Sequence, residues 1–177
     1  MKKIFVYSDG SSLKKNNMRF GGIGVYFSDN IYNNDYSVSL GLKDETMTNQ
    51  RAELLACLVA LQQSEELIKK NKIKSHEIHL YTDSRYTINS ATVWSEKWVQ
   101  NNWKRKVGTK LHDIKHIDII KKIYMLNKKL NIIFHHINSH TKEPQKTHSS
   151  WIHWNGNDKA DKLAYRASKL AEQNTVM

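Results

Sequence analysis

The stretch that decides the fold is IHLYTDSR at residues 78–85, in which an apolar, strand-like run leads into Asp83. Nearly the same phrase, IFVYSDGS, stands at residues 4–11 and leads into Asp9. For either aspartate alone a turn is the simplest interpretation, because Asp and Ser after a strand often form turns or cap helices. The two phrases indicate a shared site only if other residues bring their carboxylates together.

Around these two phrases, the hydrophobic pattern predicts alternating strands and helices. The predicted strands are 3–8, 21–27, 35–42, 77–83 and 131–137, and the predicted helices are 49–70, 84–91, 93–102, 113–128 and 157–172. Polar or basic loops are expected at 11–19, 102–110 and 141–156. Short connections favour an antiparallel meander for the first three strands, and intervening helices favour parallel pairing for the last two. The sheet is therefore expected to be mixed.

Composition favours a single domain spanning 1–177 that binds a polyanion. The chain has 177 residues and a net charge of +11, which suggests nucleic acid, although a bias toward Lys, Asn and Ile could produce the same excess. The one cysteine, Cys57, lies in an apolar run, so disulfide scaffolds and Cys-based zinc sites are excluded. There is no apolar run of membrane-spanning length and no signal-peptide core. A cytoplasmic or otherwise intracellular protein is expected.

Four acidic residues are candidates for one metal site. The first and fourth strands are strongly apolar and so are expected to be central; if they are adjacent and parallel, Asp9 and Asp83 lie at neighbouring strand ends. Glu53, early in the helix 49–70, can reach the same edge, and Asp161 on the last helix is a fourth candidate. Clustered carboxylates repel one another unless cations neutralise them, and oxygen ligands favour Mg²⁺ or Mn²⁺. A pair of such ions catalyses phosphoryl displacement, which points to a nuclease.

These motifs resemble the type-one ribonuclease H family, especially its eukaryotic-like form. The matching motifs are YSDGS around Asp9, TNQRAE ending at Glu53, YTDSRYTIN around Asp83 and GNDKAD ending at Asp161. The run WSEKWVQNNWK at 94–104 is similar to the family's substrate-binding protrusion. The resemblance covers nearly the whole chain, in order.

The resemblance implies a ribonuclease H-like α/β fold, with a five-stranded mixed sheet of order 3-2-1-4-5 and helices on both faces. It implies an endonuclease that hydrolyses the RNA strand of RNA–DNA hybrids and leaves 5′-phosphate and 3′-hydroxyl ends. The four carboxylates would hold two Mg²⁺ ions, with Mn²⁺ as a substitute and the Gly10 backbone as a further ligand. The family's separate hybrid-binding domain has no room here, and a monomer without a protein partner is expected.

The resemblance also assigns contacts with each substrate strand. Asn49, Gln50 and Asn16 would contact 2′-hydroxyls of the RNA strand. Thr48 or Asn49 can also cap the helix 49–70, and the two roles of Asn49 can coexist. Thr48 matches a contact with a DNA phosphate. The rest of that phosphate pocket departs from the family pattern, because Thr46 stands in place of an arginine and Asp113 lies near the position of an expected asparagine.

Two tryptophans are candidates for the DNA side. Trp94 and Trp98 are four residues apart and share a helix face, a spacing that is typical of core packing. The basic residues that flank them, among them Lys104, favour a platform for deoxyribose instead. The resemblance adds Tyr86 to that platform, whereas Trp103 is expected to be structural.

The segment after the fifth strand carries further candidates. The resemblance implies that His140 assists proton transfer or product release, although a lone histidine in a loop is more often an ordinary surface residue. The loop 141–156 is longer than in the family. It holds His148 and His153, which could suggest zinc, and Trp151 and Trp154, which favour a packed flap. On the last helix, Asp158 shares a face with Asp161, but the motif assigns the ligand position to Asp161.

Other functions remain open at this point. An integrase, a resolvase or a proofreading exonuclease could share the fold, but such exonucleases carry Asp-x-Glu on the first strand, and this chain has Asp9-Gly10-Ser11. A hybrid-binding module without catalysis is an alternative from another class, which would be expected to lack one of the carboxylates. Cleavage of double-stranded RNA is an alternative chemistry.

Overall fold

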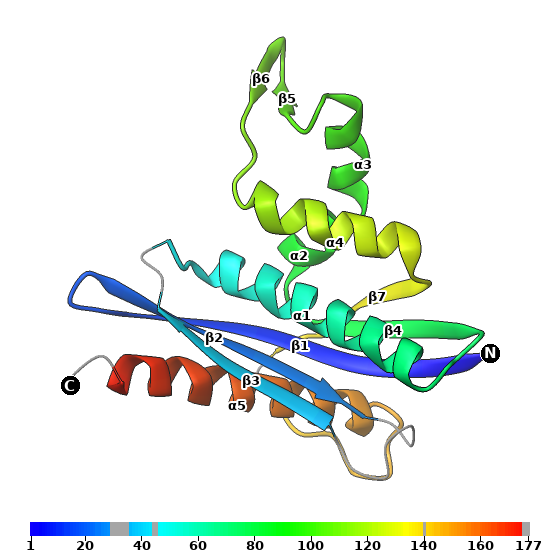
Figure 1. Cartoon of the computed structure of the whole chain (residues 1–177). Helices are drawn as coiled ribbons and strands as arrows, with labels where there is room; N and C mark the ends of the chain where they lie inside the picture. The colour runs from blue at the N-terminus through cyan, green and yellow to red at the C-terminus, as the bar shows by residue number, and fades with distance from the viewer. Residues whose placement is uncertain (29–35, 44–45, 140, 175–177) are drawn as a thin grey trace.

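The structure is a computed structural model that describes residues 1–28, 36–43, 46–139 and 141–174 (Figure 1). The strands are β1 Lys2–Lys15, β2 Met18–Phe27, β3 Tyr36–Lys43, β4 His76–Thr82, β5 Arg105–Val107, β6 Lys110–His112 and β7 Ile132–His136. The helices are α1 Asn49–Lys70, α2 Arg85–Ala91, α3 Val93–Gln100, α4 Ile117–Lys129 and α5 Trp151–Gln173. None of the helices in these ranges is both long and apolar enough to cross a membrane.

The main sheet has the order β3-β2-β1-β4-β7, which confirms the predicted order. β1 pairs antiparallel with β2, and β2 pairs antiparallel with β3. β1 pairs parallel with β4, and β4 pairs parallel with β7. Helix α1 runs along one face of the sheet and α5 along the other (Figure 1).

Strand alternation divides the apolar side chains between the two faces. Ile4 and Val6 of β1 belong to the larger core, which also contains the fully buried Cys57 of α1. The opposite face of β1 contributes Phe5 and Tyr7 to a smaller, aromatic core under α5. Each face of β1 therefore meets a helix, which explains why Ile4–Tyr7 is apolar at every position.

Helix α5 lies directly on β2 because glycine replaces side chains at the contact. A Cβ atom added at Gly24 would lie 2.0 Å from the Ala160 carbonyl oxygen. Such a distance is far below van der Waals contact, so any side chain there would push α5 away from the sheet. Gly22 and Gly24 of the GGIGVYF strand are thus required by helix packing rather than by a turn.

The structure corrects the predicted end of the first strand. β1 does not end before Asp9 but continues through the predicted polar loop 11–19 to Lys15, and it pairs with β2 along that length. The turn between them is Asn16-Asn17, whose φ angles of 48° and 63° are left-handed, as in tight hairpin turns. Asn16 therefore lies at a hairpin tip.

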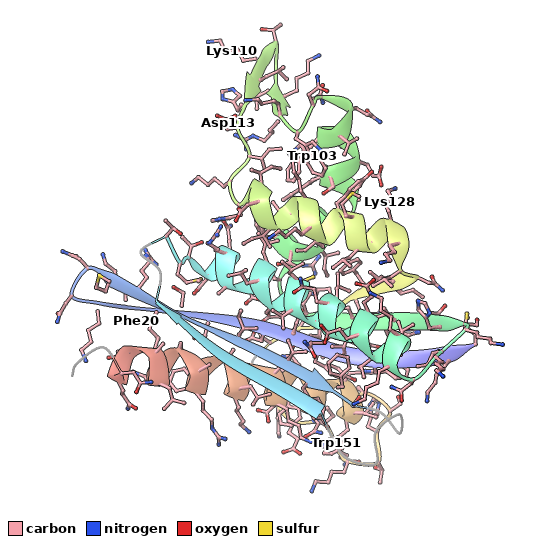
Figure 2. All side chains as sticks on the ribbon, in the orientation of Figure 1. Phe20, Trp103, Lys110, Asp113, Lys128 and Trp151 are labelled. Atoms are coloured by element: carbon pink, nitrogen blue, oxygen red, sulfur yellow. The ribbon has the colours of Figure 1, made fainter. Side chains whose placement is uncertain are left out.

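Three other boundaries differ from the prediction. The basic loop 102–110 contains most of a small hairpin, β5–β6, and α4 begins at Ile117 rather than at 113. Figure 2 places Lys110 and Asp113 on the part of the molecule that projects beyond α4. Helix α5 begins at Trp151, so residues 151–156 are helical and the predicted extended loop is shorter.

Candidate active site

The register between β1 and β4 places two carboxylates side by side. Tyr7 pairs with Tyr81, and Asp9 and Asp83 each follow two residues later, on the same side of their strands. β4 ends at Thr82 whereas β1 continues, so β1 has no β4 neighbour beside Asp9. The site forms at this step in the sheet, where side chains from both faces can meet.

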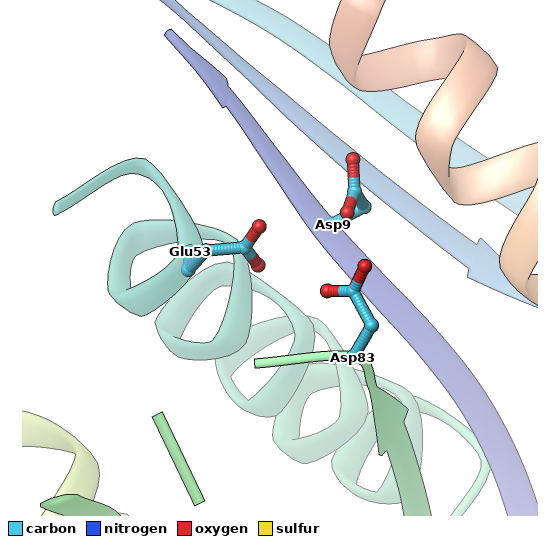
Figure 3. Close-up of side chains that lie close together, drawn as sticks. All are labelled: Asp9, Glu53 and Asp83. Atoms are coloured by element: carbon cyan, nitrogen blue, oxygen red, sulfur yellow. The ribbon is translucent and has the colours of Figure 1, made fainter. Parts of the chain in front are cut away.

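Glu53 reaches the step from the first turns of α1. Thr48 caps this helix, and its hydroxyl oxygen accepts a hydrogen bond from the Arg51 backbone N–H at 3.1 Å. Helix α1 approaches β1 so closely that a Cβ atom on Gly10 would lie 2.3 Å from the Glu53 nitrogen. Ligand oxygens of Asp9, Glu53 and Asp83 all lie within 4.8 Å of one another, and the three side chains point together (Figure 3).

Burial makes this cluster unstable as a set of bare anions. Asp9 is 7% exposed, and burial, with the charges of Asp83 and Asp161, raises its pKa to about 8. Burial and the neighbouring Asp9 charge also raise the pKa of Glu53 well above its usual value, while a hydrogen bond from the Gly10 backbone opposes both shifts. The Glu53 Oε2 atom is buried without a hydrogen-bond partner. The side chains offer only oxygen ligands, they repel one another when ionised, and one oxygen lacks a hydrogen-bond partner. These are the properties of a site for a divalent cation such as Mg²⁺.

Asp161 approaches the cluster from α5, on the other face of the sheet. It lines a pocket with Asp83, and its charge contributes to the raised pKa of Asp9. Asp158 lines the same pocket, but its carboxylate is paired with Lys162 at 2.7 Å. The geometry therefore favours Asp161 over Asp158 as the fourth candidate ligand.

The turn interpretation of the LYTDSR phrase also holds. The Ser84 hydroxyl caps α2 by accepting a hydrogen bond from the Thr87 backbone N–H at 3.2 Å. The Thr82 hydroxyl accepts a hydrogen bond from the Ser84 backbone N–H. The residues on either side of Asp83 thus build the turn, which leaves its carboxylate to face Asp9.

The other predicted site residues do not belong to the carboxylate cluster. Asn49 and Gln50 are exposed in the first turn of α1, and the helix cap is Thr48 rather than Asn49. Asn16 lies seven residues beyond Asp9, roughly 23 Å along an extended strand. His140 lies outside the described residues, so its assigned role stays a prediction, as does that of the Gly10 backbone.

The predicted DNA platform forms part of a groove between α3 and the segment before α4. Tyr86, Trp94 and Trp98 line it, with Gln50 at one side and basic residues that include Lys97, Arg105 and Lys106. Trp94 packs 5.9 Å from Trp98, centroid to centroid. Trp98 is only 8% exposed and belongs to the larger core, so the packing interpretation also holds for it. Trp103 packs edge-on against Tyr124, as expected of a structural residue.

The residue next to Thr48 is not the one that the sequence predicted. Asp113 is exposed and forms an ion pair with Lys104, so it is not the residue beside Thr48. That position is occupied by His116, whose Nε2 lies 3.5 Å from the Thr48 hydroxyl oxygen. His116 has a left-handed φ of 59° at the start of α4. His116 was not among the predicted site residues, because it lies 68 positions from Thr48 in the sequence and only the fold brings the two together.

Helix α5 contributes one pocket residue that the sequence did not single out, Asn157, and it carries the predicted Trp151, His153 and Trp154. Asn157 lines the pocket beside Asp161, is 8% exposed, and has an Oδ1 atom without a hydrogen-bond partner. The Trp154 indole N–H donates to the Thr141 carbonyl oxygen at 3.0 Å, and that of Trp151 donates to Glu143. His153 and His148 form no metal cluster with other ligands within the described residues. The two tryptophans thus hold residues 141–143 against α5, as the flap interpretation expected.

Comparison with known proteins finds the same family in sequence and in structure. The sequence pattern of the RNase H family matches residues 1–169. A ribonuclease H from Ruthia magnifica subsp. Calyptogena magnifica is 32% identical, with 93% of this chain and 94% of that protein covered. The solution structure of the PFV RNase H domain has a TM-score of 0.68 at 26% identity and covers 94% of each chain. The foamy viral protease–reverse transcriptase in complex with an RNA/DNA hybrid has a TM-score of 0.69 at 27% identity, over 93% of this chain and 20% of the other.

The family match spans the strands and helices that carry all four candidate carboxylates, and Asp9, Glu53 and Asp83 converge as a cation site requires. Sequence, fold and site geometry therefore lead to one conclusion: the chain belongs to the RNase H family.

Proposed function

We propose that this chain acts as a single-domain ribonuclease H, which hydrolyses the RNA strand of RNA–DNA hybrids with two divalent cations and leaves 5′-phosphate and 3′-hydroxyl ends. The observation that carries the proposal is the convergence of Asp9, Glu53 and Asp83 where β1 extends past β4. Membership of the RNase H family supports the reaction, and the hybrid complex of a structural relative supports the substrate.

Asp9, Glu53, Asp83 and Asp161 are the residues that would hold the cations, with Mg²⁺ as the proposed ion and Mn²⁺ as a substitute. Cations bound there would supply Lewis acidity to an attacking water and to the leaving 3′-oxygen. The protein's own part is to hold the oxygens of Asp9 and Glu53 in place at a largely buried position. Because burial favours their protonated forms, cation binding displaces protons from these two carboxyl groups.

Recognition of a hybrid requires one strand with 2′-hydroxyls and one without. We assign the RNA strand to Asn49 and Gln50 at the start of α1, with Asn16 at the β1–β2 hairpin tip as a further contact. The DNA strand is assigned to the groove that contains Tyr86 and Trp94.

Several more contacts complete the DNA side of this assignment. An aromatic wall accepts the apolar face of deoxyribose, and only the exposed edge of Trp98 is available for it. Lys104 and Thr48 would contact DNA phosphates, and His116 stands next to Thr48. His140 is assigned to proton transfer or product release.

The decisive experiment compares four labelled substrates of one sequence: an RNA–DNA hybrid, single-stranded RNA, duplex RNA and duplex DNA. Each is incubated with Mg²⁺ or with a chelator, and the product ends are mapped. We expect cleavage of the RNA strand in the hybrid alone, with Mg²⁺ alone. Binding of the hybrid without cleavage would instead identify a binding module, and equal cleavage of duplex RNA would refute the substrate assignment. Asp83→Asn is the matched inactive control.

A further inference from the structure

His153 of α5 contacts both strands that carry the active-site aspartates. Its Nδ1 atom lies 3.0 Å from the Tyr7 hydroxyl oxygen, and its Nε2 atom lies 3.5 Å from the Tyr81 hydroxyl oxygen. The imidazole also stacks on the Tyr81 ring, with centroids 4.4 Å apart and planes 20° apart. One half-buried side chain therefore bridges β1, β4 and α5.

The bridge lies close in sequence to three of the four carboxylates. Tyr7 and Tyr81 are register partners, and each precedes an active-site aspartate by two residues. His153 precedes Asp161 by eight residues, a little over two helical turns, along α5. A shift of α5 at His153 would be transmitted to Asp161, because both residues lie on one continuous helix.

Helix α5 packs so closely on Tyr7 that it has little room to shift. A Cβ atom on Gly156 would lie 2.5 Å from the Tyr7 ring, so the backbone of α5 rests directly on that tyrosine. The neighbouring Trp151 and Trp154 donate their hydrogen bonds to residues 143 and 141, before the helix, rather than to β1 or β4. The tie between the first turns of α5 and these two strands thus runs through His153 and Gly156.

The two ring nitrogens of His153 each face a tyrosine hydroxyl, and a hydroxyl can donate or accept. The Ser28 hydroxyl also donates to the Tyr7 hydroxyl oxygen, at 3.3 Å. A neutral imidazole, which has one donor and one acceptor nitrogen, can bond both tyrosines in either tautomer. Burial, followed by the charge of His79, lowers the pKa of His153, in agreement with a neutral ring that accepts at one nitrogen and donates at the other.

We infer that His153 is a positioning residue, which fixes α5 on the Tyr7–Tyr81 pair and so sets the place of Asp161 relative to Asp9 and Asp83. It touches neither substrate nor cation in this role. The inference rests on the proposed function insofar as the four carboxylates share bound cations. Its consequence is that loss of His153 weakens cation binding while hybrid binding is unchanged.

The test measures the Mg²⁺ concentration that gives half-maximal single-turnover cleavage for the wild type, His153→Ala and His153→Asn. The control is His148→Ala, because the exposed side chain of His148, among the residues that the structure describes, bonds to Ser150 of its own turn. We expect His153→Ala to raise the half-saturating Mg²⁺ roughly tenfold, the lower end of effects from residues that orient metal ligands. The dissociation constant of the hybrid in chelator should change by less than about twofold. His153→Asn, which retains a polar atom near Nδ1, should recover part of the loss.

A second readout does not depend on cleavage. Mg²⁺ should raise the Tm of the wild type and of His148→Ala by similar amounts, and that of His153→Ala by less. Tyr7→Phe should give a similar loss that is not additive with His153→Ala. An unchanged Mg²⁺ requirement and an unchanged Tm increment in His153→Ala would overturn the inference. An equal defect in His148→Ala would do the same. If the wild type cleaves no hybrid at all, the proposed function fails, and the Tm increments still decide the role of His153.

Discussion

Replacing Asp9 by Asn should stabilise the cation-free protein while it abolishes cleavage. Asp9 is buried beside Glu53 and Asp83, and its pKa rises from 3.8 to about 8. In the unfolded chain the same carboxyl ionises near pH 4. Between these two pKa values the folded state binds a proton that the unfolded state releases, so stability falls as pH rises through this window. Asn has a similar volume and no ionisation, so it removes this penalty.

The magnitude follows from the width of the window. At about 1.36 kcal/mol per pH unit, holding Asp9 protonated at pH 7 costs about 4 kcal/mol relative to an unshifted carboxyl. At pH 5 the same calculation gives about 1.6 kcal/mol. This value is an upper bound, because the same repulsion contributes to the raised pKa of both Asp9 and Glu53, and because a buried Asn also loses its hydration. We therefore expect a gain of about 2–4 kcal/mol at pH 7 and a smaller gain at pH 5.

The assay is urea unfolding followed by circular dichroism, in chelator, at pH 5 and pH 7. Asp113→Asn is the matched control, because Asp113 is exposed and paired only with a surface lysine, and it should change stability by no more than about 0.5 kcal/mol. Adding Mg²⁺ should stabilise the wild type more than Asp9→Asn, which lacks one anionic ligand. Equal stability of wild type and Asp9→Asn at pH 7 in chelator would refute the argument, because the cluster would then carry no repulsive penalty.

Three further predictions concern single side chains. Asp83→Asn should abolish cleavage of the hybrid and preserve its binding in a filter or anisotropy assay; near-normal cleavage would contradict the metal assignment. Trp98→Ala should lower the free energy of unfolding in urea by about 3–5 kcal/mol, because Trp98 is in the core. Trp94→Ala should mainly weaken hybrid binding. If Trp94→Ala instead lowered stability more and hybrid binding less than Trp98→Ala, Trp94 would not belong to the platform. His140→Ala should lower the single-turnover rate roughly ten- to a thousandfold with little change in KM, and an unchanged rate would exclude proton transfer by His140.

The sequence predicted those parts of the fold whose side chains carry an apolar pattern. Helix α1 begins and ends where its pattern and its Thr48 cap indicated. The strand order came from the family resemblance rather than from the pattern itself. The convergence of Asp9 with Asp83 depended on the same order, because local sequence does not define which strands are neighbours.

The parts that the sequence did not predict lack such a pattern. The outer half of β1 is polar, so its only signal was the Asn16-Asn17 pair, which favours the left-handed angles of a hairpin turn. The first turns of α5 were predicted as loop, yet they are helical, and the Tyr7 ring requires glycine at position 156 within them. His116 was missed since its partner Thr48 is distant in sequence.

The reactivity of Cys57 can report how often helix α1 becomes exposed to solvent. It is the single cysteine of the chain, it is fully buried in α1, and it follows Glu53 by one helical turn. Burial, with the charge of Glu53, raises the pKa of its thiol, so a thiol reagent reacts only when α1 is exposed to solvent. The labelling rate then measures how often that helix opens. Slower labelling with rising Mg²⁺ would give the affinity of the site without substrate, fluorophore or engineered residue.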